Sequence, residues 1–336
     1  MALPALRRLR AELPGATLSV LAMPGIAGLY ARESWVSEIV PLEGARGARD
    51  WRRKWRLARS LAVADFDAAV LLTNSFESAA LVRAAGIPVR IGYNRDGRGL
   101  LLTQAIRKPE RGEIPRHESF YYLELLRRAG LGGALPEGEI VIRLEGLEAA
   151  RASGLARLAE AGLDAKHVVG LSPGAAYGTA KRWLPERFAE SAAGLARHLE
   201  GGAAVAVFGT PDEQELCGQV TDMVAAQGLT ARNFAGRTKL GEFIDMAAAC
   251  RAFLTNDSGS MHIASALGVP TVAIFGATDH VGTGPTGPLA RVVRHAVDCH
   301  PHPHPCLLRE CPIDHRCMKA VSAAEVTRTA LDLLEQ

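Results

Sequence analysis

One segment of the sequence brings a carboxylate, two hydroxyls, a glycine and an imidazole to the predicted start of a helix. Its members are Asp257, Ser258, Gly259, Ser260 and His262. Backbone N–H groups at a helix start have no partner within the helix and lie at its positive end, so the amides of Gly259 and Ser260 are suited to bind an anion. Asp257 would accept a hydrogen bond from a sugar hydroxyl, and Ser258 and His262 would contact a phosphate. Together these residue types predict a nucleotide diphosphate site.

The pattern around this group is that of strand, turn, helix and strand. The run AFLTN precedes the group and TVAIFG follows it, and both short apolar runs predict buried strands. Ser258 is predicted as the helix N-cap, and Gly268 followed by Pro270 ends the helix. Turns of this kind also occur in α/β proteins for helix capping alone. From spacing alone, a ligand site and a structural turn stay open as alternatives.

A second group of candidate residues lies in the segment PGAAYGTAKRWLPE. Gly174 and Gly178 flank a turn after a predicted strand, and Thr179 adds a hydroxyl. The Lys181 ammonium would stabilise a diphosphate oxygen as the leaving group departs. The structural alternative is that Lys181 is a solvated charge beside a packed Trp183.

A third turn follows the apolar run AVAVF and reads GTPDEQE. Gly209 would allow a nucleoside to approach the backbone, and Glu213 would accept hydrogen bonds from ribose hydroxyls, as acidic residues do in other nucleotide-binding folds. A structural interpretation competes with this one. Glu is favoured in the first turn of a helix by the helix dipole alone.

Composition and charge limit the classes of protein that the chain fits. With 336 residues, 48% of them hydrophobic and 22% charged, it is long enough for two domains with full cores. The net charge of +3 gives no argument for a nucleic-acid partner. The opening MALPALRRLRAELPG has its arginines after a very short apolar run, unlike a signal peptide. We therefore expect a cytoplasmic protein, in which cysteines need not form disulfides.

Short apolar runs alternate with amphipathic runs along most of the sequence. One series extends from ATLSVLAMP at residue 16 to EIVIRL, which ends at residue 144, and a second begins with HVVGLSPG at residue 167. Single helices between strands indicate parallel, doubly wound sheets. We therefore predict an α/β protein with a first Rossmann-like domain over residues 1–150, a second over 165–321 and a terminal helix over 322–336.

Three segments resemble those of a known family. DSGSMHIASALG, LSPGAAYGTAKRWLPERFAE and RIGYNRDGRGLLLT resemble segments of the heptosyltransferases, the family 9 glycosyltransferases that build the inner core of lipopolysaccharide, and the last two point to their heptosyltransferase II branch. The resemblance implies the GT-B fold, in which two Rossmann-like domains face each other across a cleft. It also implies inverting transfer of heptose from ADP-L-glycero-D-manno-heptose to the first heptose of the inner core.

The resemblance also implies roles for individual residues. The second domain would hold the donor, with Lys181 and Asp257 as catalytic residues and His262 beside the diphosphate. The loop GRTKLGEF at residues 236–243 would border the base. GT-B transferases need no metal for catalysis, so no cofactor is expected and ADP-heptose is a substrate. The acceptor would be the lipopolysaccharide core, bound by the first domain.

The family pattern also includes a segment that this sequence does not contain. In the family, a strand ending in a Gly-Asp pair precedes residues like MALPAL, and its Asp is held to be the catalytic base. Here that first strand of the N-terminal domain is missing before Met1, and no other Asp or Glu stands out as its substitute. We expect a start assigned too late or a shortened clone. The alternatives are an inactive nucleotide-sugar-binding relative, or another sugar-nucleotide enzyme on this fold, such as an epimerase.

A basic helix is predicted from residue 50. It carries Trp51 and Trp55 one turn apart, and its basic residues are Arg52, Arg53, Lys54, Arg56 and Arg59. Such a helix would rest on an anionic membrane surface, giving peripheral contact with the inner membrane. We favour the alternative of a half-buried tryptophan stripe with a solvated basic face.

Cysteine and histidine gather near the end of the chain. The cysteines are Cys299, Cys306, Cys311 and Cys317, and the histidines are His300, His302, His304 and His315. These residues could ligate zinc, although their spacing matches no standard finger. We favour reduced cysteines that pack a loop, and no metal ligands are assigned.

Overall fold

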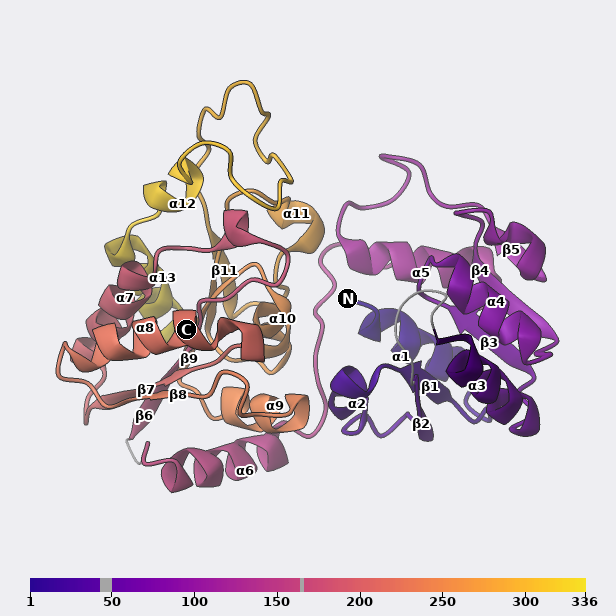
Figure 1. Ribbon diagram of the computed structural model, residues 1–336, viewed down its shortest axis with the longest axis horizontal. Coiled ribbons are helices and arrows are strands. Elements are labelled where there is room, and N and C mark those ends of the chain that lie inside the picture. Colours follow the sequence, from indigo (N-terminus) through magenta and orange to yellow (C-terminus); the bar gives the residue numbers. More distant parts are fainter. Residues whose placement is uncertain (43–49, 164–165) are drawn as a thin grey trace. The chain divides into compact units, whose positions relative to one another are not determined.

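The computed structural model describes residues 1–42, 50–163 and 166–336. The chain divides into two compact units, Met1–Gly138 and Glu139–Gln336, which Figure 1 shows as separate groups of helices and strands. Each unit is built around parallel strands. The predicted α/β class with two Rossmann-like units is therefore confirmed.

The second unit contains one parallel sheet of six strands. The strands are β6 (His167–Ser172), β7 (Ala203–Val207), β8 (Ala231–Asn233), β9 (Ala252–Asn256), β10 (Thr271–Ile274) and β11 (Ala290–Val293). Their order in the sheet is β11-β10-β9-β6-β7-β8, the doubly wound order of a dinucleotide-binding domain. The order reverses between β6 and β9. A ligand crevice is expected outside the carboxyl ends of these two strands.

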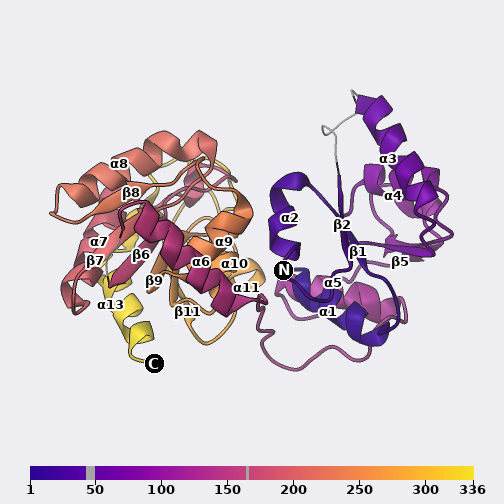
Figure 2. The same ribbon diagram turned by 90° about the horizontal axis from the view of Figure 1, so that it is seen from below.

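Helices cover this sheet. They are α6 (Leu147–Glu160), α7 (Pro185–His198), α8 (Gln214–Ala225), α9 (Leu240–Ala248), α10 (Gly259–Ala266), α11 (His280–Thr283), α12 (Arg316–Ala320) and α13 (Ala323–Leu334), with 3-10 turns η3 (Thr179–Lys181) and η4 (Pro211–Glu213). Helix α7 packs against α8 and α13, and α6 packs against α9, as Figure 2 shows from below. Fully buried side chains of β6, β7 and β9 and of α7 and α8 form one continuous core.

The first unit contains two separate parallel sheets. Its elements are α1 (Leu3–Glu12), β1 (Ser19–Ala22), α2 (Pro24–Tyr30), β2 (Glu38–Pro41), α3 (Trp51–Val63), β3 (Ala68–Leu71), α4 (Phe76–Ala84), β4 (Val89–Tyr93), η2 (Arg98–Leu101), β5 (Gln104–Ile106) and α5 (Glu118–Arg128). Strand β1 pairs with β2, and β4 lies between β3 and β5. In a doubly wound sheet, a central strand would join β1 to β3. No such strand occurs among the residues described, so β1-β2 and β3-β4-β5 stand as two sheets.

The boundary between the units lies earlier than the predicted limit of residue 150. The run EIVIRL alternates like a strand, but its amides bond to other groups than a strand ladder. Ile142 donates to the Thr286 hydroxyl at 3.0 Å, and Leu144 donates to the carbonyl of Ala266 at the end of α10 at 2.9 Å. Residues 139–150 therefore belong to the second unit. Helix α13 is also part of that unit, because it packs on α7 and supplies buried residues to the same core.

Glycine allows α6 to pack closely against α9. A Cβ atom placed on Gly154 would lie 1.9 Å from the carbonyl oxygen of Asp245 in α9, so the two helices must separate if this position carries a side chain. In α8, a Cβ atom on Gly218 would meet only the Asn233 amide nitrogen, at an ordinary 3.7 Å. Gly154 and Gly218 both lie inside helices, but only Gly154 lacks room for a side chain.

We predict opposite effects of alanine at these two positions. Gly154→Ala should lower the free energy of unfolding by about 1–3 kcal/mol through overpacking. Gly218→Ala should raise it by about 0.5–1 kcal/mol, because alanine favours the helix and finds space there. Urea unfolding of both variants and the parent measures the two effects. Stabilisation by Gly154→Ala would contradict the close α6–α9 contact.

Candidate active site

The predicted site residues of the second unit lie where the sheet order reverses. Ser172 ends β6, and Asn256 ends the neighbouring strand β9. The hydroxyls of Ser172 and Ser260 lie 2.7 Å apart and so join the end of β6 to the first turn of α10. The two loops that sequence reasoning singled out, after β6 and after β9, therefore meet at one edge of the sheet.

A buried ion pair connects these two loops. Lys181 donates from Nζ to Oδ2 of Asp257 at 2.6 Å, and their side chains are only 13% and 6% exposed. Thr278, in the loop after β10, donates its hydroxyl to the same oxygen at 2.6 Å. Lys181 and Asp257, which were predicted as residues of one site, are thus in direct contact, and their roles toward a ligand stay predictions. The alternative of a solvated Lys181 is wrong, because the ammonium is largely buried against a carboxylate.

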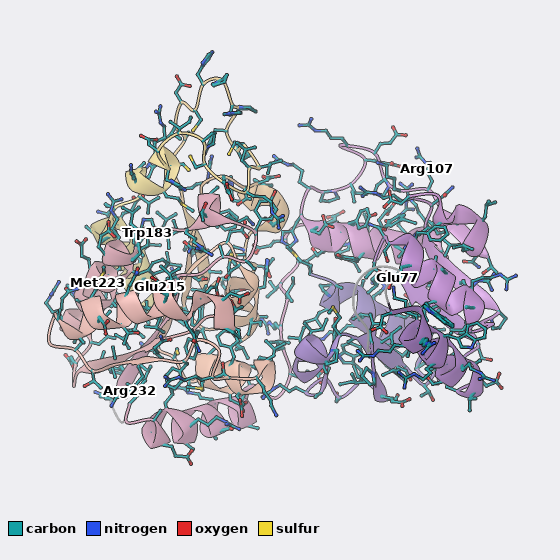
Figure 3. The ribbon with its side chains drawn as sticks, in the orientation of Figure 1. Glu77, Arg107, Trp183, Glu215, Met223 and Arg232 are labelled. Carbon is teal, nitrogen blue, oxygen red and sulfur yellow. The ribbon has the colours of Figure 1, made fainter. Side chains whose placement is uncertain are left out.

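Buried hydrogen bonds fix the backbone on both sides of the ion pair. The Asn256 side chain is fully buried. It donates to the carbonyl of Pro173 at 2.7 Å and accepts from the amide of Trp183 at 3.0 Å. The Trp183 indole is buried and donates to the Val321 carbonyl at 3.1 Å; Figure 3 labels Trp183 among the side chains of the second unit. The loop that carries Lys181 is therefore held at both ends.

Helix α10 begins as the sequence predicts, with Ser258 as its N-cap residue in extended conformation. The Ser258 side chain makes no capping bond to the helix backbone. Its hydroxyl instead lies 2.7 Å from that of Ser260 and 3.1 Å from that of Thr255. A Cβ atom on Gly259 would meet nothing within 4 Å. The helix start therefore opens onto free space, and the serine hydroxyls form a chain beside it.

Glu213 lies near the same edge of the sheet, at the end of η4. Its carboxylate accepts from the amide of Thr210 at 2.8 Å and closes a capping box. A Cβ atom on Gly174 would lie 2.1 Å from this carboxylate, and one on Gly209 would lie 2.7 Å from Cys217. Both glycines are thus explained by packing within the protein. The structural interpretation of Glu213 gains support, and ribose binding by it stays a prediction.

The remaining predicted residues take different positions. Thr179 begins η3 and is exposed, and His262 is half-buried in the first turn of α10. Sequence reasoning missed Thr278, Ser172 and Asn256. Each lies at or just after the end of a predicted strand, and this position was the available signal. Burial raises the pKa of the Cys217 thiol to about 12, with the Glu213 carboxylate as the next cause, so Cys217 stays neutral beside the site.

The cysteine-rich segment forms an extended loop between β11 and α12 (Figure 1). All six cysteines of the chain are free thiols, and Cys299 and Cys317 are buried. Burial raises the pKa of Cys299 and raises that of Cys317 to about 11, so both are protonated at neutral pH. Within the described ranges, no three His, Cys, Asp or Glu side chains are arranged to hold a metal ion. The burial of Cys299 and Cys317 agrees with cysteines that pack a loop.

Helix α3 does not carry a half-buried tryptophan stripe, and that interpretation is wrong. Trp51 and Trp55 are 64% and 54% exposed, and the helix buries Leu57, Ala58 and Leu61 instead. The buried face of α3 therefore begins at Leu57, after both tryptophans. In the part of the chain that the structure describes, no helix has the length and apolar character needed to cross a bilayer.

Comparison with known proteins gives a consistent result. The model of glycosyltransferase family 9 (heptosyltransferase) matches residues 54–315. Lipopolysaccharide heptosyltransferase 2 of Salmonella typhimurium is 33% identical over 296 residues, which cover 86% of this chain and 82% of that protein.

Two solved structures extend the likeness over nearly the whole chain. The structure of E. coli ADP-heptose LPS heptosyltransferase II has a TM-score of 0.79 and 29% identity, and the match covers 98% of this chain and 93% of that one. A family 9 glycosyltransferase from Veillonella parvula shares the fold, with a TM-score of 0.80 at 21% identity and coverage of 99% and 92%. The family match spans most of the chain and includes the loops that bear Lys181 and Asp257, so this chain belongs to glycosyltransferase family 9, the heptosyltransferases.

Proposed function

We propose that this chain transfers heptose, with inversion, from ADP-L-glycero-D-manno-heptose to the first heptose of the lipopolysaccharide inner core. Family membership supports glycosyl transfer, and the names of the similar proteins supply the donor and the acceptor class. The observation that carries the proposal is the meeting of Lys181, Asp257 and the start of α10 at the switch point of the sheet. A nucleoside diphosphate is the ligand that such a site suits.

Each part of the site has a role in the proposed reaction. The amides of Gly259 and Ser260 and the Lys181 ammonium stabilise the negative charge that develops on the diphosphate as the anomeric C–O bond breaks. Asp257 holds Lys181 in place before the donor arrives, and His262 lies beside the diphosphate. Because the site is largely buried, charge stabilisation is stronger there than in water. The proposal requires no cofactor besides the donor substrate.

The acceptor hydroxyl must lose a proton as it attacks. A carboxylate in the first unit would take this proton as general base. Donor binding and leaving-group stabilisation thus belong to the second unit, and proton removal to the first.

Transfer from ADP-heptose to a heptose-bearing core acceptor tests the function directly. The assay should be run on this chain and on a form extended by any in-frame residues that its gene encodes before Met1. Release of ADP together with heptosylated product in either form supports the proposal. Binding of ADP without transfer in both forms would instead favour a nucleotide-sugar-binding relative.

Replacement of Lys181 tests the leaving-group role. Lys181→Met should lower kcat about 10²- to 10³-fold, as loss of one preorganised charge-stabilising donor does. Lys319→Met, which removes an exposed lysine of α12, should leave the rate unchanged. Steady-state kinetics below the unfolding temperature of each variant measures both effects. A Lys181→Met enzyme with parental kcat would exclude this residue from catalysis.

We further propose that the enzyme acts at the cytoplasmic face of the inner membrane and contacts it through α3. Besides the two exposed tryptophans, this helix exposes Arg52, Arg53, Arg56 and Arg59. Its remaining basic residue, Lys54, is paired with Glu77 of α4 at 2.7 Å, a residue labelled in Figure 3. Exposed indoles next to unburied arginines suit an anionic lipid surface.

Vesicle binding tests the membrane contact. Trp51→Ala/Trp55→Ala should weaken binding to vesicles that contain anionic phospholipid by about tenfold or more, because the indoles no longer enter the interface. Met223→Ala removes an apolar side chain that is 38% exposed on α8 and should have no effect. Binding should also weaken as salt rises. Equal binding by the parent and the double variant would contradict the contact.

A further inference from the structure

A short segment of the loop between β11 and α12 contacts both loops that supply hydrogen bonds to Asp257. Leu307 donates its amide to the carbonyl of Ala277 at 2.8 Å, next to Thr278. Its carbonyl accepts from the hydroxyl of Tyr177 at 2.8 Å, in the loop that carries Lys181. Leu307 thus links the loop after β10 to the loop after β6.

Arg309 adds two contacts to the same loop. Its Nε donates to the Tyr177 carbonyl at 2.9 Å, and its own carbonyl accepts from the amide of Ala180 at 3.0 Å. The approach is close, because a Cβ atom on Gly178 would lie 2.1 Å from the Arg309 carbonyl oxygen. Lys181 follows Ala180 directly. The backbone that leads to the ammonium is therefore bonded to Arg309.

The Tyr177 ring contacts the cation itself. Lys181 Nζ lies 4.6 Å from the ring centroid, and the Arg309 guanidinium carbon lies 5.4 Å from it. A cation at this distance from an aromatic face is attracted by the ring. The ring therefore restricts where Lys181 can move while its other contact, Asp257, holds the ammonium at 2.6 Å.

The conformation of Leu307 indicates that these contacts hold the segment in place. Its φ is 56°, a left-handed value that leucine rarely adopts, and its side chain is exposed. Such a conformation persists where the surroundings fix it. In this segment, the surroundings are the hydrogen bonds to Ala277 and Tyr177.

We propose that Tyr177 and residues 307–309, which we name the clamp, are positioning residues that hold Lys181 in the geometry needed to stabilise the departing diphosphate. The clamp makes its contacts with Lys181 and its loop, and it acts on the reaction through that residue. The inference rests on the proposed function for its catalytic consequence. The proposal gives the cysteine-rich loop a function, since none of the predicted donor-site residues lies in that loop.

The structural part of the proposal is tested without ligand. Hydrogen exchange, followed by mass spectrometry of a peptide that spans residues 177–183, reports the opening of the Lys181 loop. Tyr177→Leu and Gly178→Ala should each speed exchange there by about tenfold or more. Arg316→Gln, at the first residue of α12, should not change it. Unchanged exchange in both Tyr177→Leu and Gly178→Ala would overturn the proposal whatever the enzyme's reaction is.

The positioning role is tested with a double-mutant cycle between Tyr177 and Lys181. Tyr177→Leu should lower kcat about tenfold in the parent, and less than about twofold in Lys181→Met, because it acts through a residue already removed. Tyr177→Phe keeps the ring under Lys181 and should recover most of the rate. Equal losses in both backgrounds would show a general structural effect and would overturn the positioning role.

ADP affinity, measured by calorimetry on the same variants, separates failure of the clamp from failure of the proposed function. If the parent shows no transfer, but Tyr177→Leu weakens ADP binding only when Lys181 is present, heptose transfer is contradicted and the clamp is supported. If the parent transfers heptose, but Tyr177→Leu has the same effect with and without Lys181, heptose transfer is supported and the clamp is contradicted. If ADP does not bind to the parent, the donor assignment fails, and the hydrogen-exchange result alone decides whether the clamp holds the loop.

Discussion

The arrangement of the candidate site depends on the hydrogen bonds that the Asp257 carboxylate accepts. One of its oxygens accepts from both Lys181 and Thr278, so a single atom joins the loops that follow β6, β9 and β10. Two charges in a buried position are costly to desolvate, and their attraction offsets this cost only when the geometry is good and further hydrogen bonds are made. Thr278 supplies such a bond. The pair is therefore better understood as a device for positioning than as a source of stability.

Under the proposed function, this constraint also prepares the site for a donor. An incoming diphosphate offers Lys181 a second anionic partner at the start of α10, where helix amides are already directed. Asp257 and the Tyr177 ring restrict the ammonium to one region. Preorganised charge of this kind avoids reorganisation at the moment of reaction. The same logic gives the long loop before α12 a place in the enzyme's function.

Much of the second unit was predictable because its local signals agree with its packing. Helix α7 starts at Pro185 and ends at His198, and proline at the first helical position marks such a start in the sequence. EIVIRL was misassigned because alternation shows which residues are apolar and does not show which groups receive their amides. Strand β11 (Ala290–Val293) was not predicted, because Arg291 interrupts its apolar run. Gly174 packs against Glu213, and Gly209 packs against Cys217. Glu213 lies far from Gly174 in the sequence, so no local pattern shows this contact.

A crystal structure of this chain with ADP would test the central claim most directly. The account predicts that the diphosphate oxygens lie within hydrogen-bond distance of the Gly259 and Ser260 amides and of Lys181 Nζ, at the carboxyl ends of β6 and β9. ADP bound at another part of the second unit, or a diphosphate at α10 with Lys181 still bonded to Asp257 alone, would contradict it.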